Sequence, residues 1–106
     1  MWASYAIKEQ AILTIKDAEG KLDIGRYEVE NLTSHGTRWV PFCAVGHIFH
    51  ALGGKAGNDC AQNIMPMTGL TMNEVGDITT INDNSNPEDR TRKVLEVLHA
   101  IPVEGE

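Results

Sequence analysis

Residues 85–102 read SNPEDRTRKVLEVLHAIP, and this stretch carries the strongest local signal in the chain. Pro87 suits the first position of a helix, because no hydrogen bond is lost there. Asn86 before it is a favoured cap that can accept a bond from the backbone of Asp89. Glu88 and Asp89 place negative charge at the positive end of the helix dipole. The stretch therefore predicts a helix that begins at Pro87.

One face of this helix is apolar, because four aliphatic residues recur at helical spacing: Val94, Val97, Leu98 and Ile101. Arg90 and Arg92 fall mostly outside that face. Pro102 cannot continue a helix, so the helix ends there. We expect a frayed tail from about residue 103.

A second helix is predicted after Pro41, beginning near Phe42 or Cys43. It ends at the Gly53-Gly54 pair, because glycine readily adopts the left-handed conformation of a C-terminal cap. Two further helices are shorter or less sharply bounded. One runs from about Asp59 to Met65 and is interrupted by Pro66.

The other helix has Thr71 as its cap and begins at Met72, with Glu74 three residues after the cap. This is the spacing of a capping box, in which each side chain bonds the backbone of the other residue. The β-branched run Thr79-Thr80-Ile81 weakens the far end. We therefore interpret Asn82 to Asn86 as a turn that caps the final helix.

The N-terminal third of the chain allows two interpretations. One is a helix from Ser4 to Ala18, and the other is a hairpin that pairs residues 11–16 with residues 21–29. Several residues here are strong helix formers, whereas Ile12, Thr14 and Ile15 favour a strand, so propensity alone does not decide. Of the two, we favour the helix. The segment from Gly20 to Val40 is then irregular or a short β-hairpin.

These elements predict a mainly α fold, with α+β as the alternative, in one domain that spans residues 1–106. We expect a compact bundle of about four helices. The apolar fraction of 42% is enough for a hydrophobic core.

The net charge of -6 argues against a nucleic-acid partner, because phosphate backbones select basic surfaces. No apolar run approaches the 18 to 20 residues of a membrane span, so we expect a cytoplasmic protein without a membrane partner. With two cysteines, no disulfide framework is evident. The spacing of Asn82, Asn84 and Asn86 resembles a calcium loop, but Pro87 and Lys93 occupy the positions that need glycine and glutamate.

The second helix carries the chemically reactive side chains of interest. Cys43, His47 and His50 share one stripe at positions i, i+4 and i+7. A thiol at a helix start can ionise, so Cys43 with His47 as its base could form a nucleophilic pair. His47 and His50 could instead bind zinc. The simpler interpretation is that both histidines face solvent and that Cys43 is a small buried residue.

Three segments resemble a family of small bacterial and phage domains of unknown function. They are residues 38–46 with the aromatic-Cys-x-x-Gly pattern of Phe42, Cys43 and Gly46, residues 78–84 with the pair Asn82-Asp83, and residues 94–101. The resemblance implies an N-terminal helix and structural roles for Cys43 and Gly46. Gly46 would let another backbone approach closely, and the turn at Asn82-Asp83 is the expected neighbour.

From these observations we expect a non-enzymatic accessory or interaction protein, of the kind that phages or mobile elements encode. It would bind another protein or a second copy of itself and need no cofactor. The alternative is a Cys43-dependent hydrolase or thiol enzyme, or a zinc protein that uses His47 and His50. The structural residues predicted beside them are Gly46, Asn82, Asp83, Asn86 and Pro87.

Overall fold

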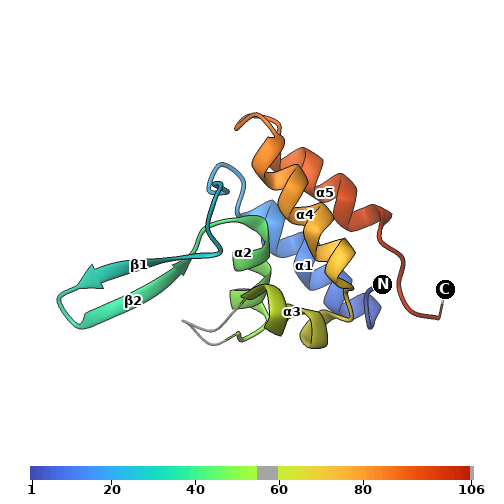
Figure 1. The fold of residues 1–106 in the computed structure, drawn as a ribbon, viewed down its shortest axis with the longest axis horizontal. Helices are drawn as coiled ribbons and strands as arrows, with labels where there is room; N and C mark the ends of the chain where they lie inside the picture. Colours follow the sequence, from blue (N-terminus) through green and yellow to red (C-terminus); the bar gives the residue numbers. More distant parts are fainter. Residues whose placement is uncertain (55–59, 106) are drawn as a thin grey trace.

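The computed structural model describes residues 1–54 and 60–105, with the backbone alone at 28–31, 33 and 37–39. Five helices and one strand pair make up the described chain (Figure 1): α1 Tyr5–Asp17, β1 Glu28–Thr33, β2 Gly36–Pro41, α2 Ala44–Ala51, α3 Cys60–Thr68, α4 Met72–Asn84 and α5 Arg90–Ala100. The mainly α prediction is confirmed, with five helices in place of about four. None of the described helices has the length and apolar character needed to cross a membrane.

Helix α1 confirms the helical interpretation of the N-terminus. Its cap is Ser4, whose hydroxyl accepts a bond from the Ile7 amide at 3.3 Å. The segment after it contains a short antiparallel hairpin of β1 and β2. Glu28 pairs with Pro41 at its base, and Thr33 pairs with Gly36 beside the turn. Figure 1 shows this hairpin extending away from the helices, along the longest dimension of a molecule measuring 47 × 29 × 21 Å.

Helix α2 ends as its sequence predicts. The Gly53 amide donates to the His50 carbonyl at 3.1 Å, and the Gly54 amide donates to the Phe49 carbonyl at 2.9 Å. Gly53 has a φ of 86°, so this is a Schellman motif that needs glycine at that position.

Helix α3 differs from its prediction at Pro66, which lies inside the helix and does not interrupt it. Proline lacks the N–H that would bond the carbonyl four residues earlier, but Ile64 and Thr68 on either side of it are buried in the core. Packing therefore outweighs the loss of one bond. The expected start near Asp59 lies outside the described residues.

Helix α4 confirms the capping box, since the Glu74 amide donates to the Thr71 hydroxyl and the Thr71 amide donates to the Glu74 carboxylate. Its far end was predicted wrongly. The helix continues through Asn84, so Asn82 and Asp83 are helical and do not belong to a turn. Tertiary contacts of Ile78 and Asn82, both fully buried, outweigh the low helix propensity of the preceding threonines.

Helix α5 begins at Arg90, three residues later than predicted. Pro87 lies in a turn, which the Asp89 amide closes by donating to the backbone carbonyl of Asn86 at 2.9 Å. The cap bond predicted for the Asn86 side chain is thus made by its main chain. The apolar face is confirmed by Val94 and Leu98, which are fully buried.

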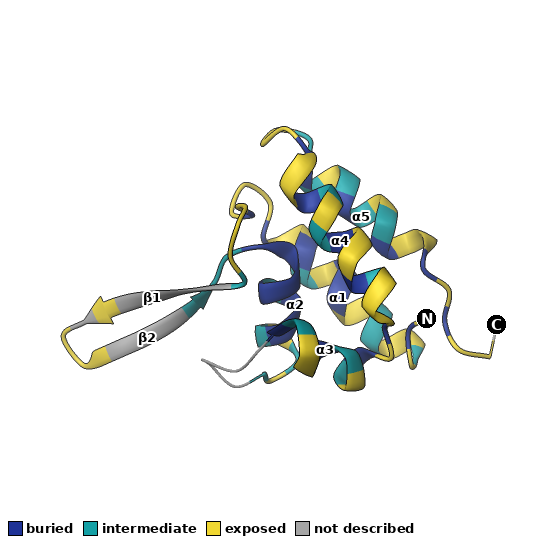
Figure 2. Ribbon diagram, in the orientation of Figure 1, coloured by how far each residue is buried: buried dark blue, intermediate teal, exposed yellow. Residues whose placement is uncertain are grey.

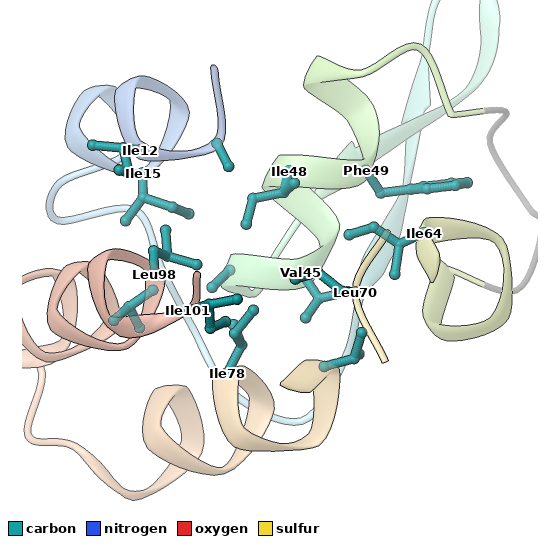
Figure 3. Close-up of a cluster of buried hydrophobic side chains, with 14 of the residues drawn as sticks. Ile12, Ile15, Val45, Ile48, Phe49, Ile64, Leu70, Ile78, Leu98 and Ile101 are labelled. Carbon is teal, nitrogen blue, oxygen red and sulfur yellow. The ribbon is translucent and has the colours of Figure 1, made fainter. Parts of the chain in front are cut away.

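The core lies between the helices of the body and draws on all five of them (Figures 2 and 3). Helix α2 passes through its centre, where Val45, Ile48 and Phe49 are buried almost completely. Residues from the other helices surround them: Ile12, Ile15, Ile64, Ile78 and Leu98.

The two ends of the chain are joined by backbone pairing. Trp2 is fully buried, and its indole N–H donates to the Leu98 carbonyl at 3.2 Å. Its amide donates to Pro102, and its carbonyl accepts from Glu104, both at 2.8 Å. Val103 is buried as well, so the frayed tail expected from about residue 103 was predicted wrongly. The reason is that Val103 forms an isolated β-bridge with Trp2.

We predict that Trp2→Ala lowers the free energy of unfolding by about 3–5 kcal/mol, because it leaves a cavity and removes the indole bond. Urea denaturation followed by circular dichroism measures this loss. Leu13→Ala is the matched control, since Leu13 is 51% exposed, and it should cost less than about 1 kcal/mol. Equal losses in the two variants would contradict the role of Trp2.

Candidate functional site

The start of α2 is the first candidate, because Cys43 is its N-cap residue. The thiol is buried, with 4% of the residue exposed. Burial raises the pKa of Cys43; hydrogen bonds from the Gly46 and Val45 amides oppose this, and the Asp83 carboxylate reinforces it. The net result is a raised pKa, so the neutral thiol is favoured at neutral pH.

His47 makes no hydrogen bond through its ring to the Cys43 thiol in the described structure. Its ring is half-buried, and burial lowers its pKa, while a hydrogen bond with the Lys21 backbone has the opposite effect. The groups that act on the Cys43 pKa are backbone amides and Asp83, and the His47 ring is not among them. The described residues therefore bring Cys43 and His47 onto one helix without joining them as a nucleophile and base.

The predicted zinc ligands lie one turn apart on α2, without a third ligand among the described residues. His50 is half-buried and its ring meets the edge of Phe49, with centroids 6.1 Å apart and planes at 86°. No group of three histidine, cysteine or acidic residues in the described chain lies close enough to hold a metal. The zinc hypothesis stays a prediction, and the geometry adds no support to it.

Cys43 lines a small cavity of about 150 Å³. Its other lining residues are Gly25, Arg26, Tyr27, Thr79 and Asp83. Ligand pockets usually enclose roughly 300–1,000 Å³, so this space suits no more than a very small molecule. Among the described residues, the start of α2 thus presents a thiol with a raised pKa beside a small cavity.

We predict that Cys43 in the folded protein reacts with iodoacetamide more slowly than a free cysteine at pH 7.5, and that raising the pH to 9 leaves it protected. A raised pKa and burial both reduce the reactive thiolate. Peptide mass spectrometry gives the labelling rate, and the urea-unfolded chain is the control. Labelling of native Cys43 at the unfolded rate or faster would restore the thiol-enzyme hypothesis.

Gly46 has the structural role that the sequence predicts, but with a different neighbour. A Cβ atom at Gly46 would lie 1.8 Å from the carbonyl oxygen of Tyr27. The backbone that approaches α2 is therefore the residue that precedes β1, and not the segment at Asn82-Asp83. Gly46 fixes the base of the hairpin against the helix.

We predict that Gly46→Ala destabilises the protein by about 1–3 kcal/mol, because backbone atoms must move to admit the methyl group. Gly76→Ala is the control, since Gly76 lies in α4 with open space around it. This control should stabilise the helix by roughly 0.5–1 kcal/mol. Thermal and urea unfolding would contradict the prediction if both variants changed stability in the same direction.

Asn82 joins three elements at the same place. Its side-chain oxygen accepts a bond from the Ala44 amide at 3.2 Å, and its NH₂ group donates to the Asp23 carbonyl at 2.8 Å. The same NH₂ group donates to Asp83 at 3.1 Å. Asn82 thus bonds the first amide of α2, which has no partner within the helix.

Arg90 belongs to the same group of hydrogen bonds as Asn82, and its structural role was not predicted from the sequence. It is buried, and its guanidinium donates to the carbonyls of Asn82, Leu22 and Ser85 at 2.7, 3.1 and 3.1 Å. Its spacing indicates burial, because Arg90 lies one turn before Val94 on the apolar face of α5. A charged residue is expected to face solvent, but backbone carbonyls at the end of α4 accept hydrogen bonds from Arg90 and compensate for its burial.

The second candidate for a functional site is the hairpin of β1 and β2, which these contacts anchor. Phe42 donates its amide to the Tyr27 carbonyl at 3.0 Å, so Tyr27–Phe42 is a hydrogen-bonded pair. Bonded and non-bonded pairs alternate along an antiparallel ladder. The pairs Glu30–Trp39 and Leu32–Thr37 are consequently non-bonded, and their backbone amides point outward from the two strands.

Both edges of this hairpin are open in the described structure, where β1 and β2 form a two-stranded sheet. Pro41 falls in a non-bonded pair of β2, where its missing N–H removes an outward donor. Strand β1 has no proline, so its outward donors are intact. The edge of β1 is therefore the better surface for an added strand.

Comparison with protein-family models, with curated proteins and with solved structures finds no match for this chain. The family resemblance of its short motifs stays a prediction.

Proposed function

We propose that this chain is a non-enzymatic interaction protein, and that the edge of β1 binds an extended segment of a partner protein as a third strand. The observation that carries the proposal is the open hairpin that extends from the helical body (Figure 1). An isolated two-stranded hairpin is marginally stable in water, and a third strand stabilises it. Strand addition at an open edge is a common mode of peptide recognition.

The anchoring of the hairpin supports this role. Its base is fixed by the Tyr27–Phe42 bond, by the bond from the Asp23 amide to the Phe42 carbonyl at 3.0 Å, and by the contact at Gly46. A fixed base holds the exposed edge in one orientation before binding. Such preorganisation reduces the entropy lost on association.

The turn of the hairpin adds an exposed apolar group. Leu32 is 82% exposed, which is the largest exposed fraction among the large hydrophobic residues described. It lies next to the turn in β1, on the strand that we assign to binding. The exposed leucine lies beside backbone amides that point outward. It can contact an apolar side chain of the strand that these amides bind.

The proposal is tested with Glu30→Pro, which removes one outward amide of β1 while the bonded pairs of the ladder keep theirs. Capture from a lysate of the source organism, quantified by mass spectrometry, should show a partner that this variant binds at least about tenfold more weakly. Glu30→Ala is the matched control and should retain the partner. Light scattering after size exclusion shows whether the added strand comes from a second copy.

A second variant keeps the test specific to one edge. Thr37→Pro removes an outward amide of β2, and it should leave binding within about twofold of the wild type. Circular dichroism confirms that the helical body stays folded in each variant. Equal binding by the Glu30→Pro and Glu30→Ala variants would refute strand addition at β1.

A further inference from the structure

A second surface lies on the helical body, where α4 and α5 pack side by side (Figure 1). Between them is an open groove of about 530 Å³. It is lined by side chains of both helices and of the segment after α5: Glu74, Asp77, Thr80, Ile81, Val97, Ala100, Ile101 and Pro102. This groove is remote in sequence from the hairpin and does not depend on the function proposed for it.

The floor of the groove is apolar. Ile81 and Val97 are half-buried, and Ala100 and Pro102 are exposed. Glu74 and Ile81 are seven residues apart on α4, which corresponds to roughly 10 Å along the helix axis. The floor is therefore long enough for about two turns of a docked helix.

The charged residues that line the groove are both acidic. Glu74 already bonds the N-terminal amino group of Met1 and the Thr71 amide. Asp77 is exposed, so its carboxylate can meet an incoming cation. The net charge of -6 gives the whole chain the same sign. The N-terminal ammonium offsets the charge of Glu74, so Asp77 supplies the uncompensated negative charge of the groove. The groove thus combines an apolar floor with an acidic side chain at its rim.

A groove of similar size between α1 and α5, about 550 Å³, has charges of both signs among its lining residues: Lys16, Glu19, Arg92 and Glu96. Arg92 pairs with Glu96 at 2.9 Å and with Asp89 at 3.3 Å. The opposite charges largely neutralise one another, so this groove favours neither a basic nor an acidic partner.

We propose that the α4–α5 groove binds a basic amphipathic helix of a partner protein. Apolar residues of that helix, spaced at i, i+3 or i+4, and i+7, contact the floor. Lysine or arginine on its flank lies near Asp77. The two helices of the groove and the docked helix then form a three-helix arrangement in which the half-buried Ile81 and Val97 lose their remaining exposure.

The probe for this proposal is a synthetic 14-residue helical peptide of leucine and lysine, with leucine at i, i+3, i+4 and i+7. Titration into the full chain with labelled methyl groups should shift the resonances of Ile81, Val97 and Ile101. A scrambled peptide of equal composition, which is not amphipathic as a helix, is the control and should bind at least about tenfold more weakly.

Two variants locate the peptide. Ala100→Trp fills the groove and should weaken binding at least about tenfold, while Ala6→Trp, at an exposed alanine of α1, should leave it unchanged. Asp77→Asn should weaken binding roughly two- to fivefold at low salt, as expected for an exposed charge pair. This second variant keeps the proposal testable if the tryptophan disturbs folding.

Three results would overturn the proposal. One is an absence of methyl shifts at Ile81, Val97 and Ile101, and another is equal affinity for the scrambled peptide. The third is a set of methyl shifts confined to Ile12 and Leu95, which would show that the peptide binds beside α1 instead of in the α4–α5 groove. None of these results depends on the β1 edge, so they are distinguishable from a failure of strand addition.

Discussion

The buried contact between Asn82 and Arg90 is the interaction on which the rest of the structure depends. Arg90 donates through its Nε to the Asn82 carbonyl, and the Asn82 side chain bonds Ala44 and Asp23. Each of these backbone groups would otherwise lose its hydrogen bond with water on burial, at a cost of roughly 1–3 kcal/mol per group. Two side chains thereby connect α4, α5, the start of α2 and the loop after α1. Directional bonds of this kind specify one arrangement of helices, whereas apolar burial alone would tolerate several.

The position of the hairpin follows from this contact. Asn82 holds the first turn of α2 and the Asp23 carbonyl, and Asp23 in turn donates to the carbonyl of Phe42 at the end of the hairpin. Gly46 then admits the Tyr27 carbonyl against α2, which is possible because no Cβ fills that space. Gly46 and Asn82, which the sequence predicts to be structural, therefore act as supports. They set the direction in which two open strand edges leave the body.

Local signals in the sequence predicted the elements well and their connections less well. The cap at Thr71, the Gly53-Gly54 end and the apolar face of α5 depend on neighbouring residues alone, so pattern and propensity suffice for them. The end of α4 and the burial of Arg90 depend on residues far away in the chain. A polar side chain such as Asn82 or Arg90 is assigned to a turn or to solvent until its buried partners are known. The same limitation applies to Val103, which is ordered by Trp2 at the opposite end of the chain.

The burial that makes α2 a support also opposes a catalytic role for it. Ionisation of Cys43 would require solvent or a positive neighbour, whereas the thiol has a raised pKa, a small cavity and the Asp83 carboxylate nearby. Desolvation also lowers the pKa of His47, so the two groups favour their neutral forms and gain little from each other. Surfaces that remain available for recognition lie at the periphery, in the β1 edge and the groove beside Asp77. A backbone edge selects a partner by its extended conformation, and an acidic apolar groove selects one by charge and helical pattern. On the two proposals, the extended segment and the helix would bind at separate places on the same small body.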